Sequence, residues 1–281
     1  MNKNRRQRQE MILAQLYEKQ EVRAAALAKD LEISEATSRR DLRTLAQAGQ
    51  VVLSYGGAVL ARSTGFSFSS KAIRNVEAKR IIGKLAASLA NDGDQVFIDS
   101  GTTAYAMAPH LKSKRGLSVV ANSARLVLEL DSPNLEVILL GGQYRHERMD
   151  TIGPLAQAAL DQLHGYVAFL GTDGLSMDHG VTASDVESAF LFRRAAANAR
   201  KVVLLADHSK FVAPSLCRLV GWDAIHLVVT DLLPAPPWLQ FFAERSIPLL
   251  CPELSQASPG AASAKPVRPK GERPTRSRKE S

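Results

Sequence analysis

Six short apolar runs alternate with helix-like segments between residues 95 and 230. Each run has four to six residues, mostly Leu or β-branched, which is typical of buried strands. Strands that alternate with helices indicate a parallel sheet with both faces covered. We therefore expect an α/β fold in which this region forms a Rossmann-like domain with a mostly parallel sheet. The expected strands are 95–98, 117–121, 135–140, 166–170, 202–206 and 225–230, and the expected helices are 103–111, 123–130, 154–163 and 186–199.

Small or hydrogen-bonding residues directly follow five of these strands. Ligands of open α/β sheets bind outside the carboxyl ends of the strands, so these residues are candidates for one site. Gly101 permits close approach to backbone N–H groups, and the hydroxyls of Thr102 and Thr103 would lie at a helix N-terminus, which favours an anion such as phosphate. Asp99 can accept hydrogen bonds from sugar hydroxyls, and Lys210 supplies a compact positive charge. The sequence therefore predicts a pocket for a small polyhydroxylated phosphate. Its expected residues are Asp99, Ser100, Gly101, Thr102, Thr103, Asn122, Gly141, Gly142, Gly171, Asp207 and Lys210.

Several common site motifs are absent from the sequence. There is no G-x-x-x-x-G-K-[ST] stretch and no G-x-G-x-x-G after the first expected strand, so neither a nucleoside triphosphate nor a dinucleotide is expected. The six histidines show no H-x-H or H-E-x-x-H spacing, and Cys217 and Cys251 show no C-x-x-C spacing. We therefore expect no cofactor, no metal site and two reduced thiols.

The stretch 33–45 has the pattern of a helix that meets a polyanion. Ser34 is suited to cap its N-terminus, and Leu42 and Leu45 fall on one buried face, opposite a face with three arginines. An earlier apolar helix ends two or three residues before Ser34, and a hairpin pattern around Gly-Gly follows, which together indicate a winged helix-turn-helix. In this motif the N-terminal end of the second helix enters the major groove. The candidate DNA-contacting residues are Ser34, Glu35, Thr37, Ser38, Arg39, Arg40, Arg43, Tyr55, Gly56 and Gly57.

Positive charge is concentrated at the two ends of the chain. The net charge is +8, of which residues 1–62 carry +4 and residues 265–281 carry +5, whereas residues 63–264 carry −1. Only the ends are therefore expected to meet phosphate backbone. We expect a winged helix-turn-helix domain over 1–62, a linker and the start of a connecting helix over 63–78, an effector-sensing α/β domain over 79–251 and a disordered basic tail over 252–281. Because no apolar run approaches the length needed to cross a bilayer, we expect a cytoplasmic protein without a membrane partner, associated with the nucleoid when bound to DNA.

The chain resembles the DeoR family of bacterial transcriptional regulators from about residue 5 to residue 233. The head carries the family's recognition stretch and the end of its wing, and the second domain carries five ordered motifs of the sensor domain. The resemblance implies a sensor fold related to ribose-phosphate isomerases, binding to operator DNA as a homo-oligomer, and control by a phosphorylated sugar or related metabolite. The matching residues are Ser34, Thr37, Arg39-Arg40-Asp41-Leu42, Gly56-Gly57-Ala58, Asp99 to Thr103, Asn122-Ser123, Gly141-Gly142, Gly153 and Asp207 to Phe211.

Three positions depart from the family pattern. Ser38 stands where the family usually has Ile or Val, and its spacing from Leu42 and Leu45 predicts a core-facing position that forgoes about 1–2 kcal/mol of apolar burial. In the wing, Leu53 replaces a commonly basic residue and Tyr55 a common His. We therefore expect DNA affinity to depend on two or more heads on repeated half-sites.

The leading hypothesis is a repressor of carbohydrate-metabolism genes that binds operator DNA and responds to a phosphorylated sugar or sugar acid. The alternative is a sugar-phosphate isomerase-like enzyme with an appended DNA-binding head, in which Asp99, Asp207 and Lys210 would move protons. No carboxylate pair has a spacing that specifies general acid–base chemistry, so catalysis is not expected. A structural nucleoid protein is disfavoured by the neutral middle of the chain.

Overall fold

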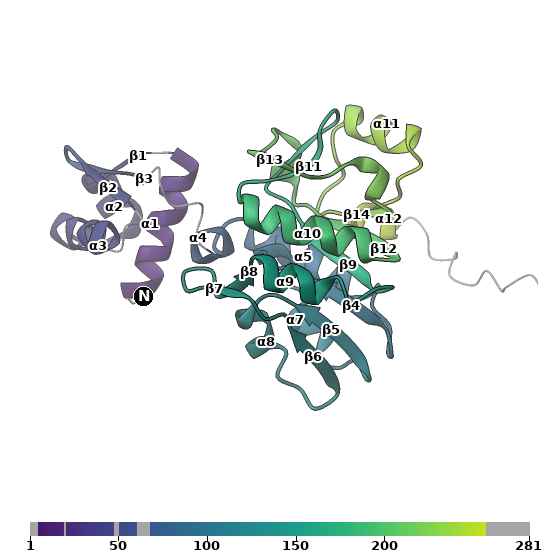
Figure 1. The fold of residues 1–281 in the computed structure, drawn as a ribbon. Helices are drawn as coiled ribbons and strands as arrows, with labels where there is room; N and C mark the ends of the chain where they lie inside the picture. Colours follow the sequence, from purple (N-terminus) through teal and green to yellow (C-terminus); the bar gives the residue numbers. More distant parts are fainter. Residues whose placement is uncertain (1–4, 20, 48–50, 61–67, 257–281) are drawn as a thin grey trace, which may run out of the picture.

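The computed structural model describes residues 5–19, 21–47, 51–60 and 68–256. A small N-terminal head lies beside a larger α/β domain, and the short helix α4 (Phe68–Ala72) lies between them (Figure 1). The head and the α/β domain of the expected fold class are both confirmed.

The head is a winged helix-turn-helix. Its three strands form an antiparallel sheet in the order β1-β3-β2, and Gly56, with φ +77°, makes the turn of the wing. The largest apolar side chains of its core include Ile12, Leu16, Leu27 and Leu42, all at most 2% exposed. The elements are α1 (Arg5–Lys19), β1 (Glu21–Arg23), α2 (Ala24–Leu31), α3 (Glu35–Gln47), β2 (Val51–Ser54) and β3 (Gly57–Leu60).

The segment between the domains differs from the expectation. A linker and the start of a connecting helix were expected over 63–78, but residues 68–72 form the separate helix α4; residues 61–67 lie outside the described part of the chain. The connecting helix, α5, begins only at Val76 and spans Val76–Ala87, so α4 and α5 are two separate helices. Asn75 interrupts the helix because its backbone is left-handed, with φ +48°.

Seven parallel strands form the main sheet in the order β15-β14-β12-β9-β4-β5-β6. All six predicted strands are present, and the last apolar run adds a seventh, β15. The strands are β4 (Gln95–Ile98), β5 (Leu117–Ala121), β6 (Leu135–Leu139), β9 (Val167–Gly171), β12 (Lys201–Leu205), β14 (Leu227–Val229) and β15 (Leu249–Leu250).

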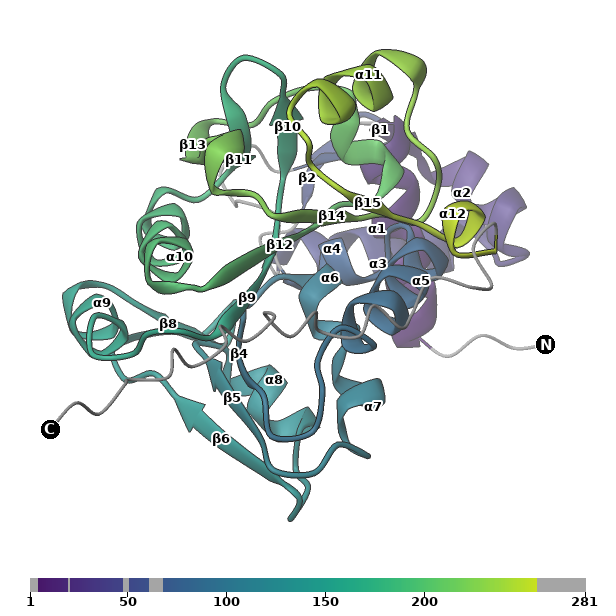
Figure 2. The same ribbon diagram turned by 90° about the vertical axis from the view of Figure 1, so that its right-hand side faces the viewer.

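Helices cover both faces of this sheet, as the alternating pattern predicts (Figure 2). One face packs on α5, α6 (Thr102–Tyr105), α7 (Ala108–Leu111) and α8 (Ala124–Glu129). The other packs on α9 (Pro154–Leu160), α10 (Val186–Asn198) and α11 (Pro236–Glu244). Alternate residues of β4 enter the two cores: Val96 and Ile98 face the first, and Phe97 faces the second.

Short antiparallel strands at one end of the domain were not predicted. They form one hairpin and one three-stranded sheet, and two of their residues, Ala183 and Leu219, border the site described below. The strands are β7 (Gln143–Arg145), β8 (Asp150–Ile152), β10 (Gly174–Ser176), β11 (Gly180–Ala183) and β13 (Cys217–Val220), with 3-10 helices η1 (His208–Phe211) and η2 (Trp222–Ala224).

Disorder was expected from residue 252 onward, but the first five residues of that tail form α12 (Pro252–Gln256). The rest of the expected tail, 257–281, lies outside the described residues. Within the described ranges, no helix combines the length and the apolar character required to cross a bilayer.

Candidate functional site

A cavity of about 430 Å³ opens at the carboxyl ends of β4, β9 and β12. The chain runs outward from β4 to β5 and β6 in one direction, and from β9 to β12, β14 and β15 in the other. The cavity therefore lies at the point where the strand order reverses, which is where open α/β sheets bind their ligands.

Seven of the eleven predicted pocket residues line this cavity. They come from the β4–α6 turn, the end of β9 and η1, three segments that the sheet brings together. The seven are Asp99, Gly101, Thr102, Thr103, Gly171, Asp207 and Lys210.

The other four, Ser100, Asn122, Gly141 and Gly142, do not line it. Ser100 donates its hydroxyl to Asp150 at 3.1 Å. Asn122 is fully buried and donates to the carbonyl of Thr151 at 2.9 Å. Gly141 and Gly142 follow the edge strand β6, where a Cβ on Gly142 would lie 2.6 Å from the carbonyl oxygen of Ile152. These residues connect the ends of β4, β5 and β6 to β8, so the prediction that the residues after five strands share one pocket fails at β5 and β6.

Asp99 braces the centre of the site. It is 2% exposed, and its carboxylate accepts hydrogen bonds from the backbone N–H groups of Gly101, at 2.7 Å, and of Gly171. Burial raises the pKa of Asp99 to about 6, although both amides favour the ionised form. The side chain therefore holds the ends of β4 and β9 together.

Three lining residues come from the segment 63–78, which was expected to be only a linker and the start of a connecting helix: Lys71, Arg74 and Asn75. A fourth, Lys79, lies one residue beyond it. Lys79 is 7% exposed and stands on the buried face of α5, one turn before Ile82. Burial lowers its pKa to about 8 despite the nearby Asp207 carboxylate. A buried ammonium group requires polar partners, so a lysine on the apolar face of a predicted helix indicates a polar site nearby. The sequence carried this signal for Lys79, but the prediction did not use it.

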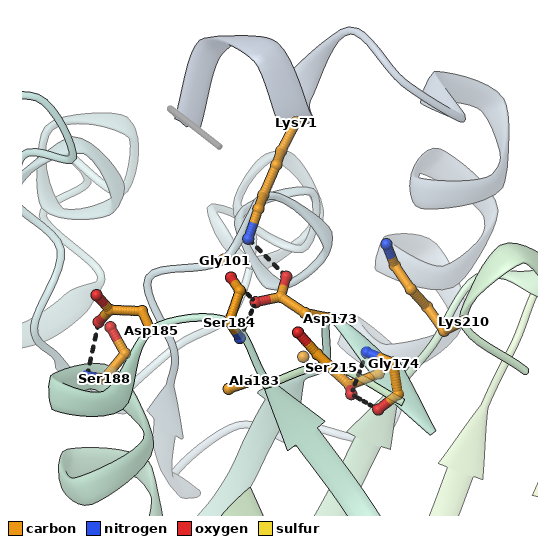
Figure 3. Close-up of polar contacts among 12 residues, drawn as sticks. Lys71, Gly101, Asp173, Gly174, Ala183, Ser184, Asp185, Ser188, Lys210 and Ser215 are labelled. Atoms are coloured by element: carbon orange, nitrogen blue, oxygen red, sulfur yellow. Dashed lines mark hydrogen bonds and ion pairs between the residues drawn. The ribbon is translucent and has the colours of Figure 1, made fainter. Parts of the chain in front are cut away.

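Carboxylates face these cations across the cavity. Asp173, which was not among the predicted pocket residues, forms an ion pair with Lys71 at 2.5 Å (Figure 3). It also accepts hydrogen bonds from the amide and the hydroxyl of Ser184, at 2.8 and 2.6 Å. Burial would raise the pKa of Asp173, but Lys71 and Ser184 outweigh it and hold that pKa below its usual range. The carboxylate of Asp207 lies 4.0 Å from the Lys210 ammonium. Burial would raise the pKa of Asp207, but Lys210, Ser209 and Asn75 outweigh burial and lower that pKa.

A second group missed from the sequence lies where α10 begins. Asp185 caps α10 by accepting from the amide of Ser188 at 2.8 Å, and it pairs with Arg145 at 2.9 Å. Burial opposes ionisation there, but the hydrogen bonds from Ser188 and Arg145 lower the pKa of Asp185 to about 2. Arg148 also lines the cavity and lies 3.7 Å from Asp185. The cavity thus combines ammonium and guanidinium groups with ionised carboxylates.

In the head, most candidate DNA-contacting side chains are exposed. Ser34 accepts from the amide of Thr37 at 3.2 Å, which caps α3, and Arg39 pairs with Glu35 at 2.6 Å on the exposed surface. Arg40 and Arg43 are exposed on the same helix, and Tyr55 and Gly56 are exposed at the tip of the wing.

Two candidates are buried instead. Ser38 is fully buried on the core side of α3, as its spacing from Leu42 and Leu45 predicted, so its inclusion among the DNA-facing residues is corrected. Gly57 is also buried, and a Cβ there would lie 1.9 Å from the carbonyl oxygen of Val22. Its role is close packing of β3 against β1.

Both domains match models of one protein family. Residues 8–64 match the DeoR-like helix-turn-helix domain, and residues 74–232 match the DeoR C terminal sensor domain. The chain belongs to the DeoR family. The cavity lies within the sensor-domain match except for Lys71, which precedes it by three residues.

Curated relatives of this DeoR-family protein are transcriptional regulators. It is 35% identical over 208 residues to the HTH-type transcriptional regulator GlpR of Haloferax volcanii, covering 73% of this chain and 82% of that protein. It is 33% identical over 229 residues to the HTH-type transcriptional repressor GlcR of Bacillus subtilis, covering 80% and 88%. Ribose 5-phosphate isomerase A of Neisseria gonorrhoeae overlaps 48% of this chain and 53% of its own at a TM-score of 0.36 and 19% identity, a likeness too weak to carry an argument. The chain is a DNA-binding transcriptional regulator, and the isomerase alternative is not favoured.

Proposed function

We propose that this regulator represses genes of carbohydrate metabolism, and that a phosphorylated sugar or sugar acid in the cavity controls its binding to operator DNA. The observation that carries the proposal is the composition of the cavity. Lys71, Lys79 and Lys210 offer ammonium donors to a phosphate or carboxylate, whereas Asp173 and Asp207 offer acceptors to hydroxyls. A ligand with an anionic group and several hydroxyls satisfies both sets.

On the DNA side, α3 would enter the major groove with its N-terminal end first. Arg39 and Arg40 would reach base edges or phosphates, Ser34 and Thr37 would donate hydroxyls to phosphates, and Tyr55 at the wing tip would lie along the adjacent backbone. One such helix reads a short half-site. We therefore propose that the protein binds as a homo-oligomer on repeated half-sites.

Thermal unfolding of the full chain tests the ligand. A panel of sugar phosphates and sugar acids is compared with the corresponding neutral sugars, because a ligand that binds only the folded state raises the transition temperature. We expect a rise with phosphorylated or acidic members alone, and its loss in Lys210→Met. The matched control is Lys112→Met, which removes an exposed lysine paired with Glu129 outside the cavity. Equal stabilisation by neutral sugars, or an undiminished rise in Lys210→Met, would contradict the assignment.

DNA binding is tested by footprinting on the region upstream of the protein's own gene and by sedimentation of the protein with the protected fragment. Arg39→Ala or Arg40→Ala should weaken specific binding by about 1–3 kcal/mol for a base contact, or reduce the salt dependence for a phosphate contact. Arg194→Ala, which removes an exposed arginine of α10, should change neither. Protection without sequence preference, or a monomer on the fragment, would count against this part of the proposal.

A further inference from the structure

Residues 68–79, which we call the connector, comprise α4, the turn after it and the start of α5. The connector touches both domains. On the head side, α4 contacts α1, and Ile73 packs against the head core. On the sensor side, the ring of Phe68 lies edge-on to Tyr105 at 5.4 Å, and the guanidinium of Arg125 lies 4.4 Å from the centre of the Phe68 ring. Any shift of the connector against the sensor domain therefore moves a surface on which the head packs (Figure 1).

The polar groups that hold the connector in place are lining groups of the cavity. Lys71 reaches from α4 to Asp173 at 2.5 Å (Figure 3). Asn75 donates to Asp207 at 3.0 Å and to Ser209 at 3.2 Å. The Lys79 ammonium donates to two carbonyls of the connector itself, that of Arg74 at 2.6 Å and that of Lys71. The connector is thus held by the same charges that an anionic ligand would use.

These bonds compete with a bound anion. Lys79 is buried, with a residue exposure of 7%, and Lys71 is half-buried, with a side-chain exposure of 20%, so both ammonium groups are partly shielded from solvent. A phosphate oxygen that engages Lys79 replaces a neutral carbonyl acceptor with a charged one, which gives the stronger hydrogen bond. A phosphate that engages Lys71 weakens its pairing with Asp173 and adds negative charge beside Asp173 and Asp207. The connector also carries the left-handed Asn75, a conformation that persists only while its surroundings hold it.

We propose that the connector transmits ligand binding to the head: an anionic group in the cavity draws Lys71 from Asp173 and Lys79 from the connector carbonyls, and this releases α4 together with the head packed on it. The proposal rests on the function proposed above, in which the cavity binds a phosphorylated sugar. It assigns Lys71 and Lys79 a double role as ligand contacts and as the restraints that ligand binding removes.

Hydrogen–deuterium exchange of the full chain tests this inference, with inorganic phosphate, ribose 5-phosphate and glucose 6-phosphate as probes. We expect a binding probe to slow amide exchange at 99–103 and 207–211, where the ligand lies, and to speed it several-fold at 68–75. Slower exchange at 99–103 with unchanged or slower exchange at 68–75 would overturn the inference and leave the proposed function intact. Unchanged exchange at 99–103 with a probe that raises the transition temperature would place the ligand outside the cavity, which would overturn the proposed function of this site and the inference with it.

Two variants test the restraint without a ligand. Asp173→Asn removes the charge that holds Lys71, so exchange at 68–75 should rise several-fold in the ligand-free protein, whereas Lys71→Arg keeps the ion pair and should exchange like the wild type. Arg194→Met breaks the exposed Arg194–Asp161 pair and serves as the matched control. Wild-type exchange at 68–75 in Asp173→Asn would overturn the inference, and the ligand experiment decides the question independently if Asp173→Asn does not fold.

Discussion

Ser38, in the recognition helix α3, lowers the stability of the head. Its side chain is fully buried, and no described residue forms a hydrogen bond with its Oγ. An unsatisfied buried hydroxyl costs about 1–3 kcal/mol. In Ser38→Ala this cost disappears and helix propensity improves by roughly 0.5 kcal/mol, while the vacated volume of one oxygen atom offsets part of the gain. We therefore expect Ser38→Ala to stabilise the head by about 1–2 kcal/mol.

Native-state hydrogen exchange of α3 measures this gain in the full chain, because it reports the opening free energy of that helix rather than of the whole protein. A gain of this size should slow the exchange of the buried-face amides of α3 by about 5- to 30-fold. Ala36→Ser introduces a serine at an exposed position of the same helix and isolates the propensity effect. Unchanged or faster exchange in Ser38→Ala would show that the hydroxyl is not a net cost. A gain no larger than the loss in Ala36→Ser would assign the whole effect to propensity.

The remaining predictions concern buried charge. Arg8→Met removes the guanidinium 3.0 Å from the buried carboxylate of Asp41, so it should destabilise the head by about 3–5 kcal/mol. The control Arg5→Met loses an exposed hydrogen bond to Thr44 and should have a small effect on stability. Similar unfolding midpoints for the two variants would contradict this prediction. The pKa of Lys79 is lowered to about 8, so Lys79 loses its charge as the pH rises through that value. Sulfate does not titrate in this range, and it should therefore bind about ten-fold more weakly at pH 9 than at pH 7. Isothermal titration checks this, and an equally steep pH dependence in Lys79→Met would refute the role of Lys79.

The fold was predictable because the strand pattern is strong locally. The runs of β4 and β5 are mostly buried, with only Gln95 exposed and Ser118 partly exposed, so nearly every other residue is apolar and the predicted bounds coincide with the observed ones. The short hairpin β7–β8 was missed because Gln143 and Tyr144 are exposed and give no alternating pattern. Asn75 carried no visible signal that it would interrupt a helix, since its left-handed backbone depends on contacts with Asp207 and Ser209 far along the chain.

The candidate site was predictable only in part, because the order of the strands along the chain does not determine which strands are neighbours in the sheet. Residues after β4, β9 and β12 meet at the reversal point, whereas Asn122 and Gly142 follow strands one and two places further out. Lys71 and Asp173 are 102 positions apart in the chain, and their contact arises from the docking of α4 on the sensor domain. Sequence motifs therefore located the cavity, and tertiary packing supplied many of its charged groups.

The balance of charge in the cavity explains why a bare anion should be a poor ligand. Phosphate or sulfate gains from Lys71, Lys79 and Lys210, but the same space lies beside the ionised carboxylates of Asp173 and Asp207, which repel it. A sugar attached to the phosphate changes this balance, because its hydroxyls donate to those carboxylates while the phosphate stays with the lysines. A sugar phosphate should therefore bind more tightly than sulfate, and the gain in affinity should exceed what the apolar contacts of the sugar alone would provide. Asp207→Asn removes one carboxylate, so it should strengthen the binding of sulfate and weaken the binding of the sugar phosphate. The difference in affinity between the two ligands should then become smaller.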